Sequence, residues 1–217
     1  MKEIIKAAEP QSFSDWKALA NDAWQPSYEA LQNPEKRALH QALLNEQGGV
    51  CCYCGRAISL TDSHIEHFRP QEKYEDFALD YNNLHASCIR ETDPGSPLHC
   101  GHAKCGDFDE NLHISPLDPS CEHRFIYTLT GSILPVDSAD VKAAYMCNLL
   151  QLNIDFLCNR RQEALTKVFD EAFIGSATDK ELETLATVFR EPNTDGHLEN
   201  FGHVLARYAE QLLGRTV

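Results

Sequence analysis

Cysteine residues at spacings that suit metal binding are concentrated between residues 51 and 105. A Cys-x-x-Cys pair, Cys51 and Cys54, opens this segment, and Cys88, Cys100 and Cys105 follow. The tight turn within such a pair can point both sulfurs at one ion, and structural zinc takes four ligands in a tetrahedron. We therefore predict a structural zinc site formed by Cys51, Cys54, Cys88 and Cys100. Cys105 is the alternative to Cys100, and buried thiols without metal are the competing interpretation.

An acidic residue and a histidine stand side by side in the segment His64-Ile65-Glu66-His67-Phe68-Arg69-Pro70. Hydrolysis of a phosphodiester needs a base to deprotonate water and a cation to stabilise the charge that builds up on the phosphate. Because side chains alternate along a strand, Glu66 could reach a metal ion while His67 faces the attacking water. We assign Glu66 as a metal ligand and His67 as the general base, and we expect Arg69 to steady the phosphate.

Asn83 and His102 complete the predicted catalytic set. The amide of Asn83 has donors and an acceptor, so we expect it to brace the loop between two strands and to hold His67 in position. His102 is the predicted second ligand of a catalytic divalent ion, with His99 as its alternative. Magnesium, with manganese as the alternative, suits such a site because it keeps several waters and needs few protein ligands.

Other histidines and a lysine in this region have expected structural roles. We expect His64 to support the site from a second layer, with direct metal contact as the alternative. His85 and His113 are expected in surface loops, and Lys104 is expected to be either a solvated helix residue or a phosphate contact.

The composition limits how this chain could bind nucleic acid. Its 217 residues carry a formal net charge of -14, whereas affinity for phosphate backbones comes mostly from Lys and Arg. A nuclease of this composition would need another component to present its substrate. Residues 1–6 lack a signal-like apolar run, and no window approaches the roughly 20 apolar residues that span a bilayer, so we expect a soluble cytoplasmic protein without membrane contact. In a reducing compartment we expect the cysteines outside the cluster, Cys121, Cys147 and Cys158, to be core residues.

The elements that must position these residues follow from periodicity and turn residues. The sequence predicts helices over 12–24 and from Asn33-Pro34-Glu35 to Gly48-Gly49. A hairpin over 56–68 that turns at Thr61-Asp62 follows, and then a loop over 91–119 with a short helix at 102–104. A second hairpin is predicted over 125–134, and helices from about 138 onward. The expected fold is α+β and mostly helical. It comprises an N-terminal helical arm (1–48), a zinc-stapled ββα finger (49–120), and a hairpin with a C-terminal helical bundle (121–217).

With these residues the chain resembles the HNH endonuclease superfamily, and more closely the PtuB-like HNH subunit of Septu-type anti-phage systems, a family also associated with some retrons. The pattern that carries the resemblance includes Gln47, 51–54, 64–70, Asn83-Leu84, Ser87-Cys88 and 99–104, and continues in 114–117, 125–131 and 149–161. One position departs from it. Gly101 stands where many HNH proteins have the histidine of Cys-His-x-x-Lys, and His102 follows, which leaves the third catalytic position open.

The resemblance implies a ββα-metal, treble-clef-like fold and an endonuclease that cuts DNA or transfer RNA as the effector of an anti-phage complex. It also implies a partner ATPase of the ABC or SMC-like type (PtuA-like). This partner would bind the nucleic acid, which the acidic chain is poorly suited to bind by itself. Two other interpretations are a zinc-containing interaction module without catalysis and a zinc nucleobase deaminase. The second is suggested by the His-x-Glu of His64-Ile65-Glu66, but the Pro-Cys-x-x-Cys expected downstream is missing.

Overall fold

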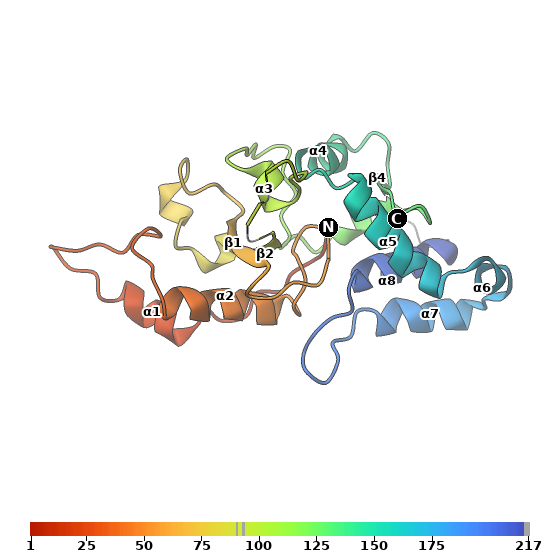
Figure 1. Cartoon of the computed structure of the whole chain (residues 1–217), viewed down its shortest axis with the longest axis horizontal. Coiled ribbons are helices and arrows are strands. Elements are labelled where there is room, and N and C mark those ends of the chain that lie inside the picture. The colour runs from red at the N-terminus through yellow and green to blue at the C-terminus, as the bar shows by residue number, and fades with distance from the viewer. Residues whose placement is uncertain (90, 93, 215–217) are drawn as a thin grey trace.

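The structure, a computed structural model, describes residues 1–89, 91–92 and 94–214. Small two-stranded sheets lie within a mostly helical frame, so the α+β, mostly helical prediction is confirmed. The N-terminal helices occupy one end of the molecule and α5 to α8 the other (Figure 1). Among the described residues, no helix combines the length and apolar character needed to cross a membrane.

Helix α1 (Gln11–Lys17) is shorter than predicted, whereas α2 (Glu35–Glu46) begins and ends as predicted. After α1, Asn21 directs its side chain to nearby backbone groups, donating to Leu19 O and accepting from Ala23 N, which competes with helix continuation. Helix α2 starts directly after Pro34 and ends before Gly48-Gly49, where both glycines have positive φ. It buries Leu39, Leu43 and Leu44 on the face that the sequence predicted.

The first predicted hairpin is wrong, because residues 56–60 do not pair with the strand that carries Glu66. Strand β1 (Ser63–His67) instead pairs antiparallel with β2 (Leu84–Cys88), in a register that sets Glu66 opposite His85. Residues 49–58 close on themselves, with Cys51 N donating to Arg56 O and Ile58 N donating to Gly49 O. These bonds fold the Cys-x-x-Cys turn and leave β1 free to pair with a strand later in the chain.

A short helix, α3 (Gly101–Lys104), packs against β2, close to the predicted 102–104. The second predicted hairpin is confirmed by β3 (Phe125–Tyr127) and β4 (Ile133–Pro135). Single turns of 3₁₀-helix cover Glu75–Phe77, Tyr81–Asn83 and Glu122–Arg124. The helices after β4 are α4 (Val141–Leu149), α5 (Asp155–Val168), α6 (Glu171–Ser176), α7 (Asp179–Val188) and α8 (Gly202–Leu212).

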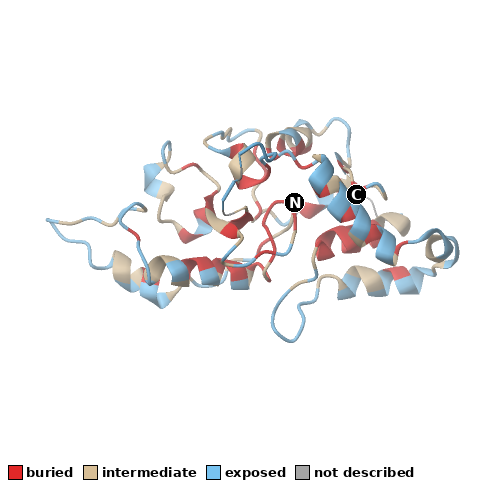
Figure 2. Ribbon diagram, viewed as in Figure 1, coloured by how far each residue is buried: buried red, intermediate tan, exposed pale blue. Residues whose placement is uncertain are grey.

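The buried side chains form a continuous core that draws on all three predicted segments (Figure 2). Leu43 of α2, Tyr53 of the Cys-x-x-Cys turn and Phe125 of β3 all belong to it. Cys121 and Cys147 are buried as predicted, whereas Cys158 is half-buried. All three predicted segments contribute to one core, and the segment boundaries at residues 48 and 120 stay a prediction.

Candidate metal centre and active site

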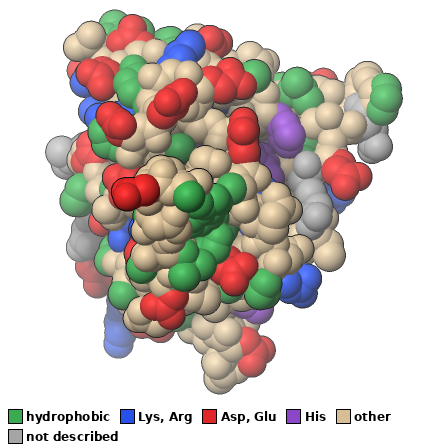
Figure 3. Space-filling view, turned by 90° about the vertical axis from the view of Figure 1, so that its left-hand side faces the viewer, with side chains coloured by type: hydrophobic (Ala, Val, Ile, Leu, Met, Phe, Trp, Pro, Cys, Tyr) green, Lys and Arg blue, Asp and Glu red, His purple; other side chains and the backbone are tan. Residues whose placement is uncertain are grey.

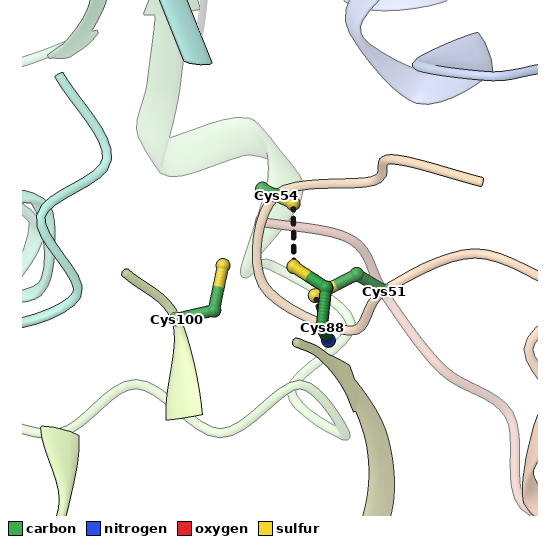
Figure 4. A group of neighbouring side chains, drawn as sticks. All are labelled: Cys51, Cys54, Cys88 and Cys100. Carbon is green, nitrogen blue, oxygen red and sulfur yellow. Dashed lines mark hydrogen bonds between the residues drawn. The ribbon is translucent and has the colours of Figure 1, made fainter. Parts of the chain in front are cut away.

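The sulfurs of Cys51, Cys54, Cys88 and Cys100 converge in the interior of the protein (Figure 4). The first two come from the turn after α2, Cys88 ends β2, and Cys100 directly precedes α3. All four side chains are buried, and their Sγ atoms lie within 4.8 Å of one another. Cys105, the alternative to Cys100, is exposed at the surface. The structure thus brings together the four cysteines that the sequence selected.

This cluster has the dimensions of a tetrahedral zinc site. A Zn–S distance of about 2.3 Å places the sulfurs of a regular tetrahedron about 3.8 Å apart, and Cys54 Sγ lies 3.6 Å from Cys88 Sγ. Burial raises the pKa of the Cys100 thiol, so a bound dication is what would favour its thiolate. The buried sulfur donors therefore fit a structural zinc ion.

Glu66 is buried and held by three polar side chains. Tyr53 donates its hydroxyl to Oε1 at 3.1 Å, and the Lys104 ammonium pairs with the same oxygen at 3.0 Å. The other oxygen, Oε2, lies 3.3 Å from Nε2 of His64. Burial alone would raise the pKa of Glu66, but His64 and Lys104 together hold it below its ordinary value. The carboxylate is therefore charged, with Oε1 anchored and Oε2 directed at a histidine.

His102 does not occupy the place beside Glu66 that the sequence analysis gave it. Its Nε2 donates to Ile89 O at 2.8 Å, and its ring lies against that of His64 with 4.5 Å between ring centroids. His99, the alternative to His102, is buried next to the cysteine cluster, with Nδ1 3.3 Å from Cys100 Sγ. His64, expected in a supporting role, is the histidine that contacts Glu66.

His67 lies at the end of β1, on the face opposite to Glu66, as strand alternation requires. Its Nε2 donates to Ala78 O at 3.1 Å, and its ring packs edge-on against Tyr28 with centroids 4.4 Å apart. Because the carbonyl can only accept, this bond leaves Nδ1 as the proton acceptor of the neutral ring. Burial lowers the pKa of His67, so the imidazole is neutral near pH 7 and suited to take a proton.

Asn83 ties the segment after β1 to the start of β2. Its Oδ1 accepts from Arg69 N at 2.7 Å, and its Nδ2 donates to Arg69 O and Phe77 O, both at 3.0 Å. The Arg69 guanidinium stacks over Phe77, 4.5 Å from the ring centroid, and approaches the exposed Glu110 carboxylate at 3.7 Å. Asn83 therefore braces the loop that leads to Ala78, the acceptor for His67.

Several side chains are more buried than their place in the sequence predicted. His85 and His113 are not surface residues: His85 is fully buried in β2 and His113 packs against Phe108. Lys104 is neither solvated nor exposed, since it is 1% exposed and also donates to His67 O at 3.0 Å. The reason is that α3 is a four-residue helix pressed against β2, so its last residue points into the protein.

Replacing His85 by leucine is expected to make the stability of the protein less sensitive to acid. Neither ring nitrogen of His85 has a hydrogen-bond partner within the described residues, and burial, with Lys6 and Lys104 nearby, lowers its pKa well below 6.5. As the pH falls, the unfolded chain would protonate His85 at a higher pH than the folded protein does. The contribution of His85 to the free energy of unfolding is therefore present above pH 6.5 and is lost as the pH falls below 6.5.

The measurement for His85 is urea unfolding at pH 6.5 and 5.5. Wild type should lose about 1 kcal/mol more of its free energy of unfolding between these values than His85→Leu loses. The exposed His197 provides the control, because His197→Leu should keep the wild-type slope. An unchanged slope in His85→Leu would contradict the expectation.

A cleft of about 440 Å³ between α2 and β1 contains functional candidates that the sequence alone did not indicate. Lys36 and Arg37 of α2 and His64 of β1 line it, and none of the described residues that line it is acidic. Tyr28, another lining residue, contacts both the Lys36 ammonium and the His67 ring. In a chain of charge -14, a cleft with only cationic charges beside the candidate base is suited to a phosphate backbone. Helical periodicity gave no signal for it, because both cations lie on the polar face of α2.

Comparison with known proteins gives one informative similarity. No family model matches the chain. Over 125 residues it is 29% identical to a protein of Vibrio cholerae serotype O1 biovar El Tor named "Retron Vc95 putative HNH endonuclease". The aligned region covers 56% of this chain and 57% of that protein, so the chain spans a little over half of the relative's length. This similarity supports the resemblance to HNH endonucleases that the cysteine and histidine motifs indicated.

Proposed function

We propose that this chain is a metal-dependent HNH endonuclease that hydrolyses phosphodiester bonds of DNA or transfer RNA. The observation that carries the proposal is the pair Glu66 and His67 on β1. One is a charged carboxylate beside a histidine, and the other is a histidine whose Nδ1 is left to accept a proton. The similarity to a retron protein named as an HNH endonuclease adds support for this class of enzyme.

In the proposed reaction His67 Nδ1 takes the proton of the attacking water, while the Ala78 carbonyl keeps the ring oriented through Nε2. Lys36 and Arg37 bind the substrate backbone in the cleft, and Asn83 keeps the segment around Ala78 in place. Mg²⁺ or Mn²⁺ bound at Glu66 would stabilise the charge that develops on the phosphate and the leaving oxygen.

We further propose that β1, β2 and α3 form the ββα finger of this nuclease, with zinc bound by the cysteine cluster as its structural staple. The order of these elements and their contacts support it, since β1 pairs with β2 and α3 packs on β2. Zinc would join the Cys-x-x-Cys turn to the end of β2 and the start of α3.

A partner that presents the substrate belongs to the proposal as well. Figure 3 shows the molecule from the end that carries the N-terminal helices. Asp and Glu side chains are spread over this surface, and Lys and Arg lie mainly near its edges. Such a surface repels a phosphate backbone outside the cleft. We propose a PtuB-like role beside an ABC or SMC-like ATPase in a Septu-type or retron-associated defence complex, in which the ATPase holds the nucleic acid.

The direct test is metal removal followed by cleavage assays, with and without the product of a neighbouring ATPase gene. We expect cleavage of either duplex DNA or transfer RNA to stop when Mg²⁺ and Mn²⁺ are removed by dialysis and to return when either is added, with the zinc content of each sample measured alongside. A chain that cuts neither substrate with either metal, alone or with the ATPase, would exclude the nuclease function.

A second candidate function, a zinc-containing interaction module, is favoured by one contact. Lys104 sets an ammonium 3.0 Å from Glu66, which neutralises the buried carboxylate without a metal ion. A non-catalytic module would bind its partner equally well as wild type and as a Glu66→Gln variant, with no cleavage in either. The deaminase interpretation finds no support, because His64 faces Glu66 and the four cysteines form a cluster without it.

A further inference from the structure

The second oxygen of Glu66 and one nitrogen of His64 face each other directly above Gly101. Tyr53 and Lys104 both engage Oε1 of Glu66, whereas Oε2 lies 3.3 Å from His64 Nε2. A Cβ added to Gly101 would lie 2.3 Å from that oxygen and 2.8 Å from that nitrogen. Two potential ligand atoms therefore lie side by side, packed closely against residue 101, where any side chain larger than glycine would push them apart.

The carbonyl of Ile89 determines which nitrogen of each neighbouring histidine carries a hydrogen. It lies 2.5 Å from His64 Nδ1 and 2.8 Å from His102 Nε2, and a carbonyl can only accept. Because Nδ1 of His64 donates to this carbonyl, Nε2, which meets Glu66 Oε2, is the nitrogen that would bind a cation in place of its proton, whereas Nε2 of His102 is already engaged. A histidine whose other nitrogen donates to a backbone carbonyl is the usual form of a metal ligand.

We infer that the divalent cation of this site is bound by Glu66 Oε2 and His64 Nε2, and that His102 is a positioning residue that supports His64. The inference rests on the proposed function and changes the second ligand from His102 to His64. Adjacent ligands of an octahedral ion, each at about 2.1 Å, lie about 3.0 Å apart, close to the observed 3.3 Å. Two protein ligands leave the remaining positions for water and a phosphate oxygen.

The location of His64 fits this assignment, because it connects the buried carboxylate to the basic cleft. The His64 side chain is 23% exposed and lines the cleft with Lys36 and Arg37, whereas the Glu66 side chain is 7% exposed. The ring of His102 packs against that of His64, with ring centroids 4.5 Å apart. The cation would therefore be reached from the same cleft that binds the substrate phosphates.

The test uses Mn²⁺ as the probe and measures binding apart from activity. Mn²⁺ affinity is titrated by electron paramagnetic resonance in the full chain, and pulsed spectra of the bound ion report nitrogen coupling from an imidazole ligand. We expect coupling in wild type and in His102→Ala, and none in His64→Ala. Affinity should fall by more than about 100-fold in His64→Ala and by about tenfold in His102→Ala, the matched control.

Other results would overturn the inference. They are nitrogen coupling that persists in His64→Ala but disappears in His102→Ala, bound Mn²⁺ without nitrogen coupling in wild type, or no Mn²⁺ binding at all. If coupling depends on His64 but no nucleic acid is cut, the ligand assignment stands and the nuclease proposal fails. If nucleic acid is cut and His64→Ala binds Mn²⁺ as wild type does, the nuclease proposal stands and the ligand assignment fails.

Gly101→Ala provides a second variant that leaves both ligands in the chain. Its Cβ would push Glu66 Oε2 and His64 Nε2 out of their present positions, so we expect Mn²⁺ affinity to fall at least about tenfold. Zinc content and the thermal melt are measured on the same sample to show that the fold persists. Wild-type Mn²⁺ affinity in a folded Gly101→Ala protein would contradict the assignment.

Discussion

Cys54→Ser is expected to lose the zinc ion and to lower the free energy of unfolding by more than about 4 kcal/mol. Cys54 is one of four buried sulfurs that lie within 4.8 Å of one another. A serine hydroxyl is a poor replacement for a thiolate ligand, and it would leave three thiols crowded in the interior. The energetic cost is large because metal binding and folding are coupled at such a site.

The matched control for this variant is Cys105→Ser. Cys105 lies in the same cysteine-rich segment but is exposed and apart from the cluster. Elemental analysis of purified proteins should give one zinc per chain for wild type and Cys105→Ser, and none for Cys54→Ser, with urea unfolding to compare stabilities. Full retention of zinc by Cys54→Ser would contradict the assignment of these cysteines as zinc ligands.

The loss of zinc should also disturb the candidate active site. The cluster joins the start of α3 to the end of β2, and Lys104, the last residue of α3, holds both Glu66 Oε1 and the carbonyl of His67. Detaching α3 would therefore remove the Lys104 ammonium from its place beside Glu66. We expect Cys54→Ser to lose cleavage together with zinc.

His67→Ala is expected to reduce metal-dependent cleavage by about 10²- to 10⁴-fold, the usual contribution of a general base. The physical reason is that Nδ1 of the neutral ring accepts the proton of the attacking water, since Nε2 donates to Ala78 O. Zinc content and folding should stay normal, because His67 is not part of the cysteine cluster. Cleavage rates are measured with the same substrate, metal and partner for every variant.

Two further variants separate catalysis by His67 from packing. His67→Gln keeps a donor for the Ala78 carbonyl but supplies no base, so it should be as inactive as His67→Ala. His197→Ala removes an exposed histidine and should cleave at the wild-type rate. Burial lowers the pKa of His67 below 6.5, so wild-type activity should persist down to pH 6.5 and decline at lower pH. Equal activity in His67→Ala would remove His67 from the mechanism.

Local sequence patterns were sufficient for the features that depend on neighbouring residues. The Cys-x-x-Cys turn, the start of α2 after Pro34 and its end at Gly48-Gly49 each follow from residues within a few positions of one another. The hairpin of β3 and β4 is equally local. Even the choice of Cys88 and Cys100 as the other members of the cysteine cluster followed from their order along the chain.

What the sequence by itself determined is therefore the set of reactive residues, while the tertiary structure decided how they are paired. β1 pairs with β2 rather than with the segment before it, because backbone bonds close residues 49–58 on themselves. That pairing buries His85 opposite Glu66 and lets α3 bring Lys104 to the carboxylate. It also brings the carbonyl of Ile89, which follows β2, to Nδ1 of His64. These contacts join residues far apart in the chain, and their energies depend on burial and register, which a single sequence does not reveal.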